Sequence, residues 1–142
     1  MAQDPARPTG ERLAAGRLHS AISNAAVRIH RDYLGRGPDR ARTTIAENLI
    51  VILMQDTLTK AEQTLVAADK GEEVLRVRRT LQQTMRAELV AAVEQLTGRP
   101  VEAFMSANHV DPDLACEVLV LGPEPTAPDD TSERDPADLA EQ

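Results

Sequence analysis

The pattern of apolar and polar positions from residue 9 onward predicts a helix of roughly 25 residues. An apolar residue recurs at steps of three or four, in Leu18, Ile22, Ala25, Ile29 and Tyr33. This spacing places one apolar stripe along a single face of the helix. Gly35 follows as a residue suited to the left-handed conformation at a helix end, and Pro38 prevents the helix from restarting nearby.

Residues 41–55 predict a β-hairpin. Positions 43–45 are β-branched, positions 47–48 are a turn-tolerant Glu-Asn pair, and positions 49–54 are all apolar. Because the second arm shows no polar alternation, we expect it to lie centrally in its sheet with both faces covered.

Two further helices are predicted after this hairpin. Thr59 and Glu62 form a capping-box pattern, which predicts the start of a short helix that ends near Ala68. A longer helix is expected from Glu72 to the Gly-Arg-Pro break at 98–100. Its apolar positions keep to one face, and they are Val74, Val77, Leu81, Met85, Leu89, Ala92, Val93 and Leu96.

Two apolar segments separated by a turn predict a second hairpin. Residues 101–107 and 114–121 flank the turn-rich segment His-Val-Asp-Pro-Asp at 109–113. The predicted order is helix–hairpin–helix–helix–hairpin. Its simplest assembly is an α+β fold in which a four-stranded antiparallel sheet carries the helices on one face.

Charge and composition divide the chain into three parts. Residues 1–8 have two prolines and almost no large apolar side chain, and we expect a disordered leader. Residues 9–121 are enough for one modest core and are expected to form a single domain. Residues 122–142 hold seven acidic residues against one basic residue, so we expect a disordered acidic, Pro-rich tail.

Composition also narrows the functional classes. Residues 11–121 hold fourteen Arg or Lys and fifteen Asp or Glu, and Tyr33 and Phe104 are the chain's only Phe, Tyr or Trp rings. Without a basic field or stacking platform, nucleic-acid binding is not expected. Cys116 is expected to be a buried, unreactive thiol. No apolar stretch suits a signal core or a membrane span, so we expect a cytoplasmic protein without direct membrane insertion.

No catalytic, cofactor-binding or metal residue is predicted. His19 and His30 lie eleven positions apart on one helix, which separates them by roughly 16 Å, too far to share an ion. His109, Asp111 and Asp113 offer metal donors in a turn, but the His or Cys pairs typical of zinc sites are missing, which favours an ordinary turn. No serine or cysteine lies in a nucleophile-elbow or phosphate-loop pattern, so we do not expect an enzyme.

Two surfaces are candidates for contacts. Arg76, Arg79 and Arg86 lie within about 80° of one another on the long helix, a face that can contact an anion or a partner, although a simple solvated face is the more common outcome. The runs at 49–54 and 118–121 are apolar on both sides, so one face of the sheet is expected to lack cover. A homodimer that buries this face would resolve the exposure.

Three segments together resemble the MpsC or YbcI-like family of small, largely uncharacterised bacterial proteins. They are the Gly-Arg-Gly-Pro break, the Leu-Thr-x-x-Glu-x-x-Leu pattern at 58–65, and the segment 93–104. The motif residues, which we interpret as structural, are Gly35, Gly37, Pro38, Thr59, Glu62, Thr97, Gly98 and Phe104. The family is named after a sodium-translocating system that generates membrane potential.

The resemblance implies a non-catalytic cytoplasmic accessory or regulatory module without established catalytic residues. Its partner would be a membrane ion-transport protein or a signalling protein, and any transport role would be indirect because the sequence shows no membrane-spanning segment. The alternative is a small-ligand-binding protein or an uncharacterised enzyme that uses the Arg76 and Arg79 face or the His109 turn.

Overall fold

A computed structural model describes residues 9–125, with side chains from residue 14 onward. Its elements are α1 (Thr9–Leu34), β1 (Arg40–Ala46), β2 (Leu49–Gln55), α2 (Lys60–Ala67), α3 (Gly71–Thr97), β3 (Val101–His109) and β4 (Leu114–Leu121). The expected leader at 1–8, and the expected tail from residue 126 on, lie outside the described residues.

The four strands form one antiparallel sheet in the order β1-β2-β4-β3. Each hairpin therefore contributes one central and one edge strand. Val51 of β2 pairs with Val118 of β4, and this pairing joins the two hairpins across the middle of the sheet. The predicted α+β class is confirmed, and so is the central position of the second arm of the first hairpin.

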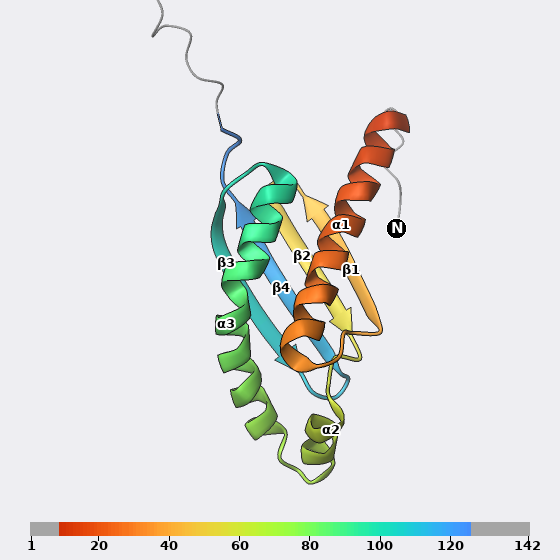
Figure 1. Ribbon diagram of the computed structural model, residues 1–142, viewed down its shortest axis with the longest axis vertical. Helices are drawn as coiled ribbons and strands as arrows, with labels where there is room; N and C mark the ends of the chain where they lie inside the picture. Colours follow the sequence, from red (N-terminus) through yellow and green to blue (C-terminus); the bar gives the residue numbers. More distant parts are fainter. Residues whose placement is uncertain (1–8, 126–142) are drawn as a thin grey trace, which may run out of the picture.

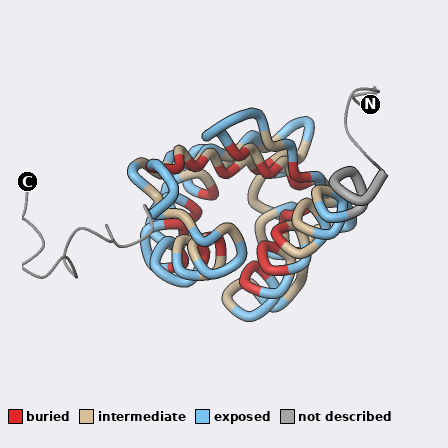
Figure 2. Tube along the Cα trace, turned by 90° about the horizontal axis from the view of Figure 1, so that it is seen from above, coloured by how far each residue is buried: buried red, intermediate tan, exposed pale blue. Residues whose placement is uncertain are grey.

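Two helices cover one face of this sheet. Figure 1 shows α1 and α3 lying across the strands, and Figure 2 shows both helices on the same side of the sheet layer. The buried residues, red in Figure 2, gather where the two layers meet. Because only alternate strand residues face the helices, the core takes Ile50, Ile52 and Met54 from β2 and Ala115, Leu119 and Leu121 from β4.

The helix α2 does not help to cover the sheet. It lies beyond the strand ends in Figure 1, packs against α3 and has no buried residue of its own. The expectation that residues 49–54 are covered on both faces is therefore wrong within the described residues. Leu49 is 37% exposed, and Val51 and Leu53 are half-buried on the face away from the helices.

The two glycine breaks end the long helices as expected. Gly35 after α1 has φ +80° and Gly98 after α3 has φ +68°, both in the left-handed region that favours glycine. The Gly98 N–H still donates to the Glu94 carbonyl at 2.9 Å, so the last turn of α3 is closed before the chain turns away.

The buried face of α3 differs from the predicted apolar stripe. Val77 is 56% exposed and Leu96 is 40% exposed, whereas Arg78 and Gln82 are buried. The difference arises because polar groups of other elements lie against the first half of α3. The inward-facing residues there are Val74, Arg78 and Gln82, rather than apolar residues alone.

None of the helices within residues 9–125 is long and apolar enough to cross a membrane.

Candidate functional site

The side of the sheet that faces away from α1 and α3 is mainly apolar at its centre. We define this outer sheet face by six residues at alternate positions of β2, β4 and β3: Val51, Leu53, Met105, Cys116, Val118 and Val120. Their neighbours in the strands point into the core, so the strict two-residue period of the backbone turns these side chains outward.

Exposure and charge distinguish the outer sheet face from the rest of the surface. Met105, on the edge strand β3 beside Val118 of the central strand β4, is 55% exposed, which is high for a large apolar side chain. Arg40 and Arg42 lie at outer positions of the edge strand β1. At the opposite edge, β3 carries the exposed Glu102 at its bulge and the exposed His109 at its end. Beside the two arginines lies a shallow hollow of about 340 Å³, lined also by Leu53 and Gln55. The face is thus an apolar surface with a positively charged edge.

Cys116 belongs to this face, so the expected burial of its thiol is only partly correct. The side chain is half-buried. Burial, together with the nearby Glu117 carboxyl, raises the pKa of the Cys116 thiol, and the protonated form is a poor nucleophile. The cysteine therefore contributes apolar surface rather than reactivity.

A buried polar pair lies under the helices on the opposite face of the sheet. Glu117 of β4 is 2% exposed and His30 of α1 is also buried, with 3.8 Å between Glu117 Oε1 and His30 Nε2. His30 Nδ1 donates to the Ala26 carbonyl at 2.9 Å, so in the neutral ring Nε2 carries the lone pair that faces Glu117.

Burial favours the neutral form of both groups. It raises the pKa of Glu117 to about 7, although the nearby Ser106 hydroxyl acts in the other direction without meeting hydrogen-bond geometry. Burial lowers the pKa of His30, the Ala26 hydrogen bond opposes this, and the Arg78 charge adds to the lowering. Near neutral pH the pair is therefore an uncharged imidazole beside a carboxyl that is close to half-protonated.

Three buried polar atoms around this pair lack a hydrogen-bond partner among the described residues. They are Gln82 Nε2 on α3, Ser106 Oγ on β3 and Glu117 Oε2. Most buried polar groups in native proteins form hydrogen bonds, so three unsatisfied polar atoms in one region are unusual. The sequence patterns did not predict this cluster, although Glu117 is the one charged residue in the apolar run 114–121 and is the signal that could have indicated it.

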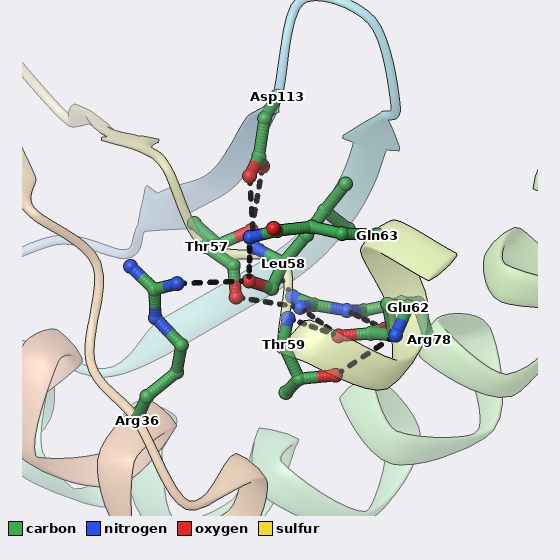
Figure 3. A network of polar contacts seen from close by, with 8 residues as sticks. All are labelled: Arg36, Thr57, Leu58, Thr59, Glu62, Gln63, Arg78 and Asp113. Atoms are coloured by element: carbon green, nitrogen blue, oxygen red, sulfur yellow. Dashed lines mark hydrogen bonds and ion pairs between the residues drawn. The ribbon is translucent and has the colours of Figure 1, made fainter. Parts of the chain in front are cut away.

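A second polar network fixes the end of the molecule where α2 lies (Figure 3). Arg78, only 1% exposed, donates two 2.6 Å hydrogen bonds to the Glu62 carboxylate. Its guanidinium also donates to the carbonyl and hydroxyl of Thr57. Asp113, from the turn between β3 and β4, accepts hydrogen bonds from the Thr57 hydroxyl and the Leu58 N–H. The loop between β2 and α2 is therefore held from several elements at once.

The contacts of this network stabilise the fold. All of its charged groups are paired within the chain, and Asp113 is occupied by backbone and hydroxyl donors. His109 in the same turn is exposed, and its Nδ1 lies 2.7 Å from the Pro112 carbonyl. No group of three or more His, Cys, Asp or Glu among residues 9–125 is placed to hold a metal ion.

The three arginines singled out on the long helix separate into two groups. Arg79 and Arg86 line a small hollow between α3 and β3, together with Gln82 and Ser106. Arg76 is exposed but is not among the lining residues. The structure thus brings two of the three into one site.

The residues behind the family resemblance occupy turns and helix ends, except Phe104, which lies within β3 and packs against the core. Thr59 and Glu62 form the predicted capping box, in which each side chain accepts a hydrogen bond from the backbone N–H of the other. Thr97 Oγ1 donates to the Val93 carbonyl at 2.7 Å and accepts from the Arg99 N–H. These contacts fit the structural interpretation of the motifs.

Comparison with known proteins places this chain among bacterial proteins of similar size. It is 24% identical over 96 residues to the uncharacterised protein YrhF of Bacillus subtilis (strain 168), covering 66% of this chain and 79% of that protein. It is 29% identical over 97 residues to the uncharacterised protein YbcI of the same organism, covering 63% and 73%. No solved structure matches the chain. Residues 14–122, nearly the whole folded part, match the family described as the Na+-translocating membrane potential-generating system, and the chain belongs to this MpsC family.

Proposed function

We propose that this MpsC-family domain is a non-catalytic interaction module that forms a homodimer through its outer sheet face. The observation that carries the proposal is the apolar surface on the central strands, which no described helix covers. Contiguous apolar surface on a folded protein is commonly the site of association with a partner.

A second copy of the chain is the occupant that suits this face. An interface around a two-fold axis must be self-complementary, and apolar side chains on the two central strands, with the ionisable residues at the edge strands, meet that requirement. Two sheets packed face to face, about 10 Å apart, form an ordinary β-sandwich core. Four strands of about seven residues give a face of roughly 20 by 23 Å, which is small for a specific interface, so we expect a dimer of micromolar affinity.

The dimer would act as an accessory or regulatory protein in the cytoplasm, serving a membrane ion-transport or signalling partner. The family's description, which refers to Na+ translocation and membrane potential, supports this direction. Because no described helix can cross a membrane, the contribution to ion movement would pass through a membrane-embedded partner.

The oligomeric state of matched variants tests the proposal. Met105 and Val77 are almost equally exposed, at 55% and 56%, but only Met105 lies on the outer sheet face. Light scattering after size-exclusion chromatography at about 10 to 100 μM should give twice the 15.4 kDa protomer mass for the wild-type chain. Met105→Glu should shift the mass to one protomer, because it places a charge on the apolar face directly beside Val118 of the central strand β4.

Val77→Glu is the control and should leave the dimer intact. Circular dichroism melting of each variant separates loss of the dimer from loss of the fold. A wild-type chain that is monomeric across this concentration range, or a dimer that Met105→Glu leaves unchanged, would overturn the assignment of the face.

A further inference from the structure

The groove between α3 and β3 has the composition of a small binding site. It is about 170 Å³ in volume and lies on the helix side of the sheet, away from the outer sheet face. Its six lining residues are Arg79, Gln82, Gln83, Arg86, Phe104 and Ser106. Apart from the Phe104 ring, every one of them carries a hydrogen-bond donor on its side chain.

The two arginines bring positive charge that the chain does not neutralise. Neither guanidinium has an ion-pair partner among the described residues. No acidic residue lies three or four positions from Arg79 or Arg86 on the helix, where intrahelical pairs form. The charge therefore remains available to a ligand.

Arg86 is held over the groove by an aromatic contact. Its guanidinium carbon lies 5.6 Å from the centre of the Phe104 ring, within the range of a cation–π interaction. Arg79 lies seven residues earlier on α3, about 10 Å away along the axis. Long side chains can converge across that distance, so the two guanidinium groups can approach one ligand from both ends of the groove.

The floor of the groove supplies two polar groups without partners. Gln82 is 8% exposed, and its Nε2 has no hydrogen-bond acceptor among the described residues. Ser106 Oγ, on the neighbouring strand, is likewise unpaired. Both atoms are closed off from solvent, but the terminal torsion of a glutamine amide is soft, so a small rotation can turn the N–H donors toward a ligand.

We propose that this groove binds a small free oxyanion, a phosphate or carboxylate group held between Arg79 and Arg86 with donors from Gln82 and Ser106. Guanidinium groups match the oxygen pairs of such anions in bidentate geometry, and amide and hydroxyl donors complete the remaining oxygen positions. The neighbouring carboxyl, Glu117, is largely neutral in slightly acidic solution, where it adds little opposing charge.

Calorimetric titration of the full chain with inorganic phosphate, and separately with succinate, tests the site at constant ionic strength and pH 6.5. Arg86→Gln and Arg79→Gln should each weaken binding by about tenfold or more, the worth of one charge-assisted hydrogen bond. The matched control is Arg76→Gln, which removes the same charge from an exposed position of the same helix that does not line the groove. It should change the affinity by no more than about twofold.

Gln82→Met separates a binding role of Gln82 from a purely structural one, because stability and anion affinity should change differently. Removing an unpaired buried amide should leave the melting temperature unchanged or raise it, while anion binding becomes weaker. Co-sedimentation with phosphatidylcholine vesicles containing phosphatidylglycerol distinguishes a lipid headgroup from a free anion, because Arg86-dependent sedimentation would assign the phosphate to lipid and contradict a free ligand.

Two results would overturn the proposal. One is the absence of saturable binding of either anion up to about 10 mM, since weaker association is not specific recognition. The other is an equal loss of affinity in Arg76→Gln, which would show diffuse attraction to the helix. Met105→Glu should retain anion binding, so a failure of this proposal and a failure of the dimer proposal are separate results.

Discussion

At the scale of single residues, the most consequential group is the carboxyl of Glu117. It is buried in the centre of β4, and the group 3.8 Å from its Oε1 is the imidazole of His30, whose lowered pKa favours the neutral form, rather than a cation. Its pKa of about 7 lies above the ordinary carboxyl value, so the folded protein binds a proton more tightly than the unfolded chain does. The stabilisation from this proton is complete below about pH 4.5 and is lost as the pH rises through 7.

Glu117→Gln should remove this pH dependence. Between pH 6.5 and 8.5 the Glu117 carboxyl should lower the wild-type free energy of unfolding by roughly 1 kcal/mol relative to the variant, whose side chain at 117 is neutral at every pH. The pKa of His30 is lowered in the folded protein, so the unfolded chain loses a proton from His30 across this window and stability rises slightly. This rise is common to wild type and variant and cancels in their difference. Urea unfolding at several pH values measures the difference.

Glu72→Gln, at an exposed position on α3, is the control and should keep the wild-type slope. A Glu117→Gln profile parallel to that of the wild type would show that Glu117 does not titrate between pH 6.5 and 8.5 in the folded protein, contrary to this prediction.

The Arg78–Glu62 pair should be the most sensitive polar contact in the domain. Burial alone would raise the pKa of Glu62, but the hydrogen bonds from Arg78 and the Thr59 backbone outweigh it and the pKa is lowered. Glu62→Gln leaves a buried guanidinium without its counter-charge and should cost about 3 kcal/mol in the free energy of unfolding. Glutamine can still serve the capping box, so the loss reports the charge.

The exposed pair Lys70–Glu73 provides the comparison, since both side chains are more than half exposed. Glu73→Gln should cost less than about 0.5 kcal/mol in the same urea experiment. Because a lowered acid pKa stabilises the fold above the ordinary carboxyl range, the gap between wild type and Glu62→Gln should narrow as the pH falls below about 4. Equal losses in the two variants would mean that burial of the Arg78 pair has no energetic effect.

At the scale of helices and strands, the glycines give a matched pair of predictions. Gly98 ends α3 at φ +68°, whereas Gly16 lies inside α1, and a Cβ added at either would meet no atom within 4 Å. Sterics around the side chain are thus equal, and only the backbone conformation differs. Gly98→Ala should destabilise the fold by about 1 kcal/mol, and Gly16→Ala should stabilise it by a similar amount.

Thermal melting of both variants under one condition measures the two effects with opposite signs. A shift of the same sign in both would contradict the left-handed end of α3 as the source of the glycine requirement.

Local sequence signals predicted most of the elements because their causes are local. The capping box places the start of α2, and the glycines at 35 and 98 end α1 and α3, since each acts through its own backbone. The position of α2 was not predictable in this way. A capping pattern specifies where a helix begins but carries no information about what the helix packs against, and α2 packs at the end of α3.

The buried face of α3 was misjudged for a related reason. An arginine in a helix is normally exposed, so the sequence gives no sign that Arg78 is buried until its partners are known. Glu62 and Thr57, which hold it, lie sixteen and twenty-one residues away, and only the tertiary structure brings them together.

At the scale of the whole molecule, the fold class could be predicted but the strand order could not. Each hairpin is fixed by neighbouring residues, whereas the pairing of β2 with β4 depends on how the hairpins meet. The apolar runs did predict an uncovered apolar face. A strand with helices on one face and water on the other normally alternates apolar and polar residues, and these runs do not alternate. The proposed dimer face rests on this same pattern.

The two proposed surfaces lie on opposite sides of the sheet. The outer sheet face is formed by the strands alone, and the anion groove lies on the helix side between α3 and β3. A dimer formed through the strands would therefore leave the groove of each protomer accessible. Ligand occupancy and self-association should vary independently.

The strand order also determines when the domain can fold. The last of the described strands, β4, is a central strand, and its residue Val118 pairs with Val51, which is synthesised 67 positions earlier. Before residues 114–121 leave the ribosome, β2 and β3 have no partner on their inner edges, and the two halves of the sheet are separate. Folding of the sheet thus waits for a long-range closure that is possible only once β4 has been made. A chain truncated before β4 would lose the middle of the sheet, whereas one truncated after Leu121 would retain each of the four described strands.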